Sequence, residues 1–235
     1  GNVVGIPTET VYGLAADARN PEAVRQIFAA KGRPADNPLI VHIAKLEELE
    51  SVAVSVPELA LKLAEKFWPG PLTMILPKHP SIPVITSGGL DTVGVRMPSH
   101  PVARKLIELS GVPIAAPSAN ISGYPSPTTA QHVMRDMHGK IAAVVDGGDC
   151  RVGVESTVIA LEGEDSVRIL RPGYVTKEML ETVVPHVTLD KAILHQLQEG
   201  QIVRSPGMKY QHYSPHAHVT LIEGRWPEFA AWVQQ

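Results

Sequence analysis

Short apolar runs rich in β-branched residues alternate with amphipathic patterns along this chain, and this alternation limits the folds open to it. Seven such runs predict strands, at residues 39–43, 72–76, 93–95, 114–116, 141–145, 158–161 and 167–170. Amphipathic patterns that predict helices separate several of them, at residues 57–67, 101–109 and 128–138. Several late strands follow one another without a helix. The pattern therefore predicts an α/β fold with a mixed parallel and antiparallel sheet.

A further helix is predicted between Asn20 and Gly32. Asn20 suits the N-cap, Pro21 the first helical position, and Gly32 ends the pattern. Lys31 and Arg33 then lie where the backbone changes direction, so their charges can point into a cavity and bind an anion. The alternative is that Lys31 only complements the negative end of the helix dipole.

The composition excludes several classes of function. The chain has 235 residues, with 21 basic and 24 acidic side chains, and no basic stripe indicates a nucleic-acid-binding surface. A single cysteine, Cys150, excludes an internal disulfide framework and a thiolate zinc site, which fits a reducing cytoplasm. The apolar runs are shorter than the roughly 20 residues of a membrane span, so we expect no membrane association.

The familiar nucleotide-binding fingerprints are absent from the sequence, which has neither a P-loop motif nor a dinucleotide-binding glycine motif. Phosphates can instead be held by scattered basic and polar groups that converge from several loops. The candidates at predicted strand ends are Lys31, Arg33, Ser118, Asn120 and Arg171. For Arg171, a surface arginine at a strand end is the alternative.

Arg96 is the strongest candidate for binding a carboxylate. It ends an apolar strand, where a guanidinium can make a bidentate pair with a planar carboxylate, and a structural salt bridge, which is common at such a place, is the alternative. His42 interrupts the apolar strand at 39–43. A histidine in such a place is more often a hydrogen-bonded core residue than a catalytic one. The glycine-rich turn at 146–153 is a simple hairpin or a place where backbone approaches a ligand, in which case Ser156 points inward.

Two nucleophile hypotheses are rejected on context. Cys150 has no partner histidine in the pattern, and Ser118 lacks the G-x-S-x-G surroundings of a nucleophile elbow.

Taken together, the motifs resemble a known family. Pro-Thr-Glu-Thr-Val-Tyr-Gly-Leu at 7–14, Lys-x-Arg at 31–33 and Ser-x-Asn at 118–120 resemble the threonylcarbamoyl-adenylate synthases, or YrdC-like proteins. The later run at 205–215 resembles the linker of the family's longer, two-domain form. The resemblance covers roughly residues 1–215.

The resemblance implies a twisted mixed sheet with helices around a deep central cavity. It implies an enzyme that forms threonylcarbamoyl-adenylate and pyrophosphate from L-threonine, bicarbonate or CO₂, and ATP, with Mg²⁺ held mainly by the ATP phosphates. The product would feed a separate transferase that modifies an adenosine of tRNA, and weak tRNA binding is compatible with it.

The resemblance also assigns residues to each substrate. It implies catalytic roles for Lys31 and Arg33. It implies ATP binding by Lys31, Arg33, Asn37, Thr92, Ser118, Asn120, Ser126, Arg171 and His212. It implies threonine binding by Thr10, His42, Arg96, Ala116 and Ser156, with a possible role as base for His42.

Three domains are expected: a catalytic domain at 1–186 without its N-terminal start, a linker or lid at 187–216, and the start of a truncated C-terminal α/β unit at 217–235. Residues 218–224 are expected to form a strand of that unit, and a short helix follows from Trp226. Two other functions remain open: the carbamoyl-transfer module of a hydrogenase-maturation protein, and a non-catalytic RNA-binding module. Threonine-dependent release of pyrophosphate from ATP distinguishes the three.

Overall fold

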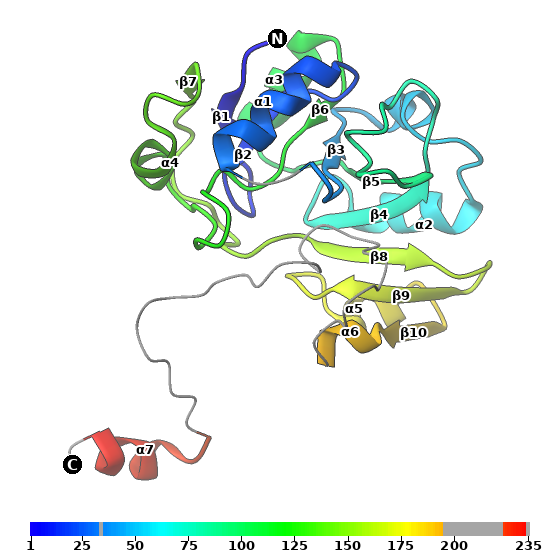
Figure 1. Cartoon of the computed structure of the whole chain (residues 1–235). Helices are drawn as coiled ribbons and strands as arrows, with labels where there is room; N and C mark the ends of the chain where they lie inside the picture. Colours follow the sequence, from blue (N-terminus) through cyan, green and yellow to red (C-terminus); the bar gives the residue numbers. More distant parts are fainter. Residues whose placement is uncertain (33–34, 195–222, 234–235) are drawn as a thin grey trace.

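The computed structural model describes residues 1–32, 35–194 and 223–233 (Figure 1). The strands are β1 (Val4–Ile6), β2 (Gly13–Asp17), β3 (Ile40–His42), β4 (Leu72–Pro77), β5 (Thr92–Arg96), β6 (Ile114–Ala115), β7 (Ala143–Val144), β8 (Thr157–Leu161), β9 (Ser166–Arg171) and β10 (His186–Leu189). The helices are α1 (Pro21–Lys31), a 3₁₀ helix η1 (Leu46–Ser51), α2 (Glu58–Phe67), α3 (Pro101–Ser110), α4 (Ala130–Met137), α5 (Lys177–Glu181), α6 (Lys191–Leu194) and α7 (Trp226–Val233).

The ten strands form one mixed sheet in the order β10-β9-β8-β4-β5-β3-β6-β2-β1-β7. Parallel pairs are β1–β7, β3–β5, β4–β8 and β9–β10, and the remaining neighbours are antiparallel. The prediction of a mixed sheet is confirmed. The mixed character of the sheet has a physical cause at β8 and β9. These strands follow each other in a hairpin and so must pair antiparallel.

The strands and helices predicted from periodicity are present, with ends that differ by a few residues. The opening residues 1–6 also read as a strand and contain β1, whereas two strands, β2 and β10, were missed. β2 has the sequence Gly-Leu-Ala-Ala-Asp, which lacks β-branched residues, and it is a strand because β1 and β6 supply hydrogen-bond partners on its two sides. β10 pairs with β9, and α6 follows it within the predicted linker. Residues 187–189 and 191–194 are therefore regular structure.

The predicted boundary at residue 186 is not otherwise tested. The helix expected from Trp226 is confirmed as α7. The predicted strand at 218–224 and the predicted lid at 205–215 lie wholly or mostly outside the described residues.

Helix α1 shows how local sequence places a functional side chain. The Asn20 side chain accepts hydrogen bonds from two backbone N–H groups of the first turn, and Gly32 ends the helix with a left-handed φ of 65°. The apolar stripe packs the helix against the sheet beside β2 (Figure 1). As a result Lys31, expected just beyond the helix, is its last residue and is only 2% exposed.

The topology gathers several strand ends at one edge of the sheet. β3 and β5 are parallel, so His42 and Arg96, at their carboxyl ends, are register partners. β8 runs antiparallel to β5, since it is parallel to β4, and its amino end therefore lies at the same edge. β9 returns antiparallel to β8 and brings Arg171 back to that edge. Residues from four separate parts of the sequence thus meet there.

Candidate active site at the strand ends

A cavity opens at this edge of the sheet. Its lining residues come from the loop before β2, from β3 and the residues before it, from β5, from the segment after β6, and from the ends of β8 and β9. They are Thr10, Val11, Pro38, Leu39, Ile40, His42, Arg96, Ala116, Pro117, Ser118, Glu155, Ser156 and Arg171. All five residues assigned to threonine line this cavity, together with Ser118 and Arg171 from the set assigned to ATP.

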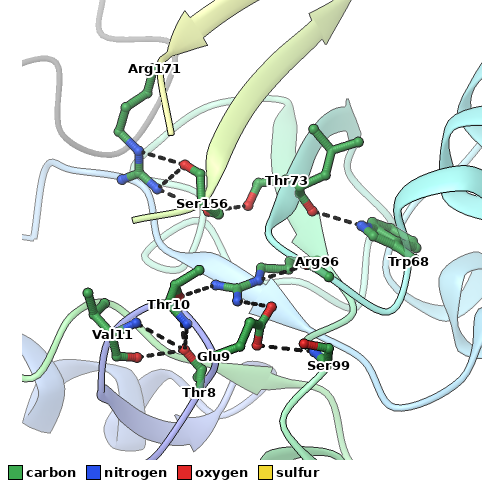
Figure 2. Close-up of polar contacts among 12 residues, drawn as sticks. Thr8, Glu9, Thr10, Val11, Trp68, Thr73, Arg96, Ser99, Ser156 and Arg171 are labelled. Atoms are coloured by element: carbon green, nitrogen blue, oxygen red, sulfur yellow. Dashed lines mark hydrogen bonds and ion pairs between the residues drawn. The ribbon is translucent and has the colours of Figure 1, made fainter. Parts of the chain in front are cut away.

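Arg96 is the centre of a buried polar network (Figure 2). Its Nη2 donates to Glu9 Oε1 at 2.6 Å, its Nη1 donates to Thr10 Oγ1 at 2.9 Å, and its Nε donates to the Gly70 carbonyl at 3.3 Å. The other Glu9 oxygen accepts from the backbone N–H of Ser99 at 3.1 Å. The alternative of a structural salt bridge is therefore present, and because Arg96 also lines the cavity, its contact with a carboxylate ligand stays a prediction.

His42 lies beside Arg96 and is uncharged at neutral pH. Burial and the nearby Arg96 guanidinium lower the pKa of His42 to about 3. Its Nδ1 lies 3.2 Å from the Ile40 carbonyl oxygen. A ring with so low a pKa makes hydrogen bonds but holds a proton poorly, so the geometry favours a binding contact over the role of general base.

Ser156 is held from two sides at the amino end of β8. Its Oγ lies 2.8 Å from Thr73 Oγ1 and accepts from Arg171 Nη2 at 3.1 Å, and Arg171 also donates to the Ser156 carbonyl (Figure 2). Gly173 packs so closely that an added Cβ would lie 2.4 Å from the Glu155 carbonyl oxygen. Only glycine allows the turn after β9 to hold Arg171 against this segment.

Lys31 does not line the cavity. Its Nζ donates to the carbonyl oxygens of Ser118 at 2.5 Å and Asn120 at 2.8 Å, and Asn120 Oδ1 lies 3.5 Å away. Ser118 Oγ donates to Asn120 Oδ1 at 2.6 Å, and Asn120 Nδ2 donates to the carbonyls of Ile121 and Tyr124. Lys31 and Asn120 thus shape the loop that presents Ser118 to the cavity. A direct contact of either with ATP stays a prediction.

Two of the remaining residues assigned to ATP, Asn37 and Ser126, lie next to residues that line the cavity. Asn37 is fully buried next to the lining residue Pro38, and among the described residues its amide has no hydrogen-bond partner. Ser126 donates to the lining residue Glu155 at 2.5 Å. Thr92 starts β5 and so lies at the opposite end of that strand from Arg96. Arg33 and His212 lie outside the described residues.

Sequence reasoning missed two acidic residues of the site. Glu9 pairs with Arg96 behind the cavity, and Glu155 lines it. A signal was present for Glu9, since a carboxylate between two threonines directly after an apolar strand is costly to bury unless a cation pairs with it. The apolar wall of Val11, Leu39 and Ile40 was also unassigned.

Three further observations concern the described residues. No group of three or more His, Cys, Asp or Glu side chains among them is arranged to hold a metal ion. No helix in the same ranges is long and apolar enough to cross a membrane. Burial raises the pKa of the Cys150 thiol to about 11, which agrees with rejecting it as a nucleophile.

A mixed α/β sheet whose strand ends enclose an arginine-containing cavity defines a domain that binds small molecules. The chain belongs to the Sua5/YciO/YrdC family: the family profile described as "Telomere recombination" matches residues 1–173. A second profile, described as "Threonylcarbamoyl-AMP synthase, C-terminal domain", matches residues 175–232, so the chain has the two-domain form.

Named relatives extend over nearly the whole chain. It is 55% identical to threonylcarbamoyl-AMP synthase of Pyrococcus abyssi, over 95% of this chain and 65% of the relative, and 54% identical to that of Bacillus subtilis, over 94% and 63%. It is also similar to the crystal structure of Pyrococcus abyssi Sua5 complexed with L-threonine, with a TM-score of 0.93, 52% identity, and coverage of 99% of this chain and 67% of that one. The chain spans less than two thirds of the length of the two named synthases.

Proposed function

We propose that this chain carries the synthase site of an enzyme that forms threonylcarbamoyl-AMP and pyrophosphate from L-threonine, bicarbonate or CO₂, and ATP. The observation that carries the proposal is the convergence of Thr10, His42, Arg96 and Ser156 in one cavity. The similarity to a Sua5 structure that contains L-threonine supports the choice of amino acid.

The cavity offers a binding mode for the amino acid. The Arg96 guanidinium, held between Glu9 and Thr10, faces the cavity and can pair with the threonine carboxylate. Neutral His42 and the Ser156 hydroxyl can hydrogen-bond the other polar groups of threonine. Enclosure by the apolar wall would limit access of water, which decomposes a carbamate.

The reaction itself needs two bond-forming steps. The deprotonated threonine amine adds its lone pair to the carbon of CO₂, which forms the N–C bond of a carbamate and releases a proton. A carbamate oxygen then attacks the α-phosphorus of ATP, and the bond from that phosphorus to pyrophosphate breaks. Arg171, at the cavity wall, can stabilise the negative charge that gathers on the phosphate oxygens.

Mg²⁺ held mainly by the ATP phosphates would supply positive charge beside the departing pyrophosphate. Glu155 lines the cavity, and its carboxylate oxygens could bind the ion or accept hydrogen bonds from water bound to it. The downstream transferase, weak tRNA binding and a cytoplasmic location stay predictions.

The test is the release of pyrophosphate from ATP by the full chain, measured with and without L-threonine and with and without bicarbonate. Release that requires both, together with the mass of threonylcarbamoyl-AMP, supports the proposal. Use of carbamoyl phosphate in place of threonine and bicarbonate would indicate the hydrogenase-maturation type of activity. Binding of RNA without any turnover would indicate the non-catalytic alternative.

A further inference from the structure

The Glu9 carboxylate does not line the cavity, but it contacts Arg96, which does. Its side chain is 7% exposed, and that of Arg96 is 4% exposed. One Glu9 oxygen accepts from Arg96 Nη2 at 2.6 Å and the other from the Ser99 backbone N–H at 3.1 Å (Figure 2). Because both oxygens are engaged, Glu9 ties the guanidinium to the backbone that follows β5, and Arg96 cannot turn without losing this support.

The hydrogen bonds of Arg96 leave a defined set of donors for a ligand. A guanidinium has five N–H groups. In the described residues Nε donates to Gly70, one N–H of Nη1 donates to Thr10, and one N–H of Nη2 donates to Glu9. One N–H therefore remains on each terminal nitrogen, and a carboxylate bound by two parallel hydrogen bonds needs two.

Glu9 also determines the charge that a ligand meets. Arg96 contributes one positive charge and Glu9 one negative charge, and the buried His42 ring beside them is uncharged. This end of the cavity is therefore neutral overall. A ligand with a carboxylate alone is attracted by Arg96 and repelled by Glu9. An α-amino acid zwitterion is also neutral, and its ammonium group is attracted by Glu9, so the two charges of the ligand match the two of the protein.

We propose that Glu9 is a positioning and specificity-determining residue, which makes this end of the cavity select zwitterionic α-amino acids over carboxylates that have no amine. Glu9 acts by orienting Arg96 and by balancing its charge, without touching the reacting atoms. The inference rests on the proposed function, because it concerns the same amino-acid site.

The experiment compares the wild-type chain with Glu9→Gln, a substitution that removes the charge and keeps the side-chain shape. Calorimetric titration gives the dissociation constants of L-threonine and of L-lactate, which has the carboxylate but a hydroxyl in place of the ammonium. We expect the wild type to prefer L-threonine, and the lactate-to-threonine ratio of dissociation constants to fall by about tenfold or more in Glu9→Gln. The substitution removes the attraction between the Glu9 carboxylate and the ammonium group of L-threonine, and a tenfold change in the ratio corresponds to about 1.4 kcal/mol.

A matched control is Glu48→Gln. Glu48 also uses a carboxylate oxygen to accept from a backbone N–H, that of Ala44 at 2.8 Å, but it does not contact Arg96. The control should leave the ratio unchanged. An equal loss of affinity for both ligands in Glu9→Gln would mean that Glu9 is only structural, and would overturn the proposal.

The remaining outcomes separate this inference from the proposed function. If the wild type binds L-threonine and the ratio is unchanged in Glu9→Gln, the role of Glu9 alone is overturned. If the wild type binds no L-threonine, the proposed function fails first. Should Glu9→Gln not fold, the wild type still decides, because equal affinity for L-threonine and L-lactate would contradict the selectivity.

Discussion

Replacing Lys31 by methionine should destabilise the protein and disturb the cavity indirectly. The ammonium group holds the Ser118–Asn120 loop through two carbonyl oxygens at 2.5 and 2.8 Å, in a setting that is 2% exposed. Methionine keeps the unbranched apolar stem and removes the charge. The hydrogen bond from the Ser122 N–H to the Lys31 backbone carbonyl, at 3.0 Å, does not depend on the side chain and should remain.

The expected magnitude follows from these contacts. Hydrogen bonds to a charged group contribute about 1.5–3 kcal/mol each, so losing two should lower the free energy of unfolding by roughly 3–6 kcal/mol. At about 2–4 °C per kcal/mol for a chain of this size, the melting temperature should fall by roughly 6–24 °C. Pyrophosphate release should fall as well, since a shift of about 1 Å in a substrate-positioning group such as Ser118 can reduce turnover by up to about 100-fold.

The assay combines thermal unfolding with threonine-dependent pyrophosphate release. Lys66→Met is the matched control, because Lys66 also lies in the last turn of a helix, α2, but its side chain is exposed. The control should melt within about 2 °C of the wild type, as expected for an exposed site. An unchanged melting temperature for Lys31→Met with a large loss of turnover would refute the loop-holding role and show that Lys31 acts on the ligand directly.

Three further predictions follow from the site. Arg96→Gln should weaken binding of L-threonine far more than binding of ATP in calorimetric titrations; equal losses would make Arg96 a shared or structural residue. His42 has a folded-state pKa below its ordinary value, so between about pH 6.5 and pH 3 the unfolded chain binds a proton that the folded chain does not, and stability falls as pH falls. Denaturant unfolding should therefore show the wild type losing about 2 kcal/mol more than His42→Gln between about pH 7 and pH 5, and parallel pH profiles would contradict this. Because burial raises the pKa of Cys150 to about 11, iodoacetamide should modify the native protein near pH 8 far more slowly than the unfolded chain, and equal rates would contradict the burial.

The sequence by itself determined most of the element types and named most of the residues that line the cavity's polar side. Periodicity located the strands on which His42 and Arg96 lie, and cap residues such as Asn20 and Gly32 fixed the ends of α1. These features are local, because hydrogen bonds and side-chain spacing within a few residues decide them. The motif resemblance selected the five residues assigned to threonine, and the cavity brings these five together.

The tertiary structure alone decided the direction and the partners of the charged groups. The residues next to Lys31 in the sequence do not indicate its hydrogen-bond partners. Only the packing of α1 against the sheet brings Lys31 to the carbonyls of Ser118 and Asn120. Likewise Glu9 and Arg96 are 87 positions apart, and the ion pair exists because β5 ends next to the loop after β1. Charges and hydrogen bonds act through space, and the distances between distant segments are set by sheet topology, which no local pattern of residues contains.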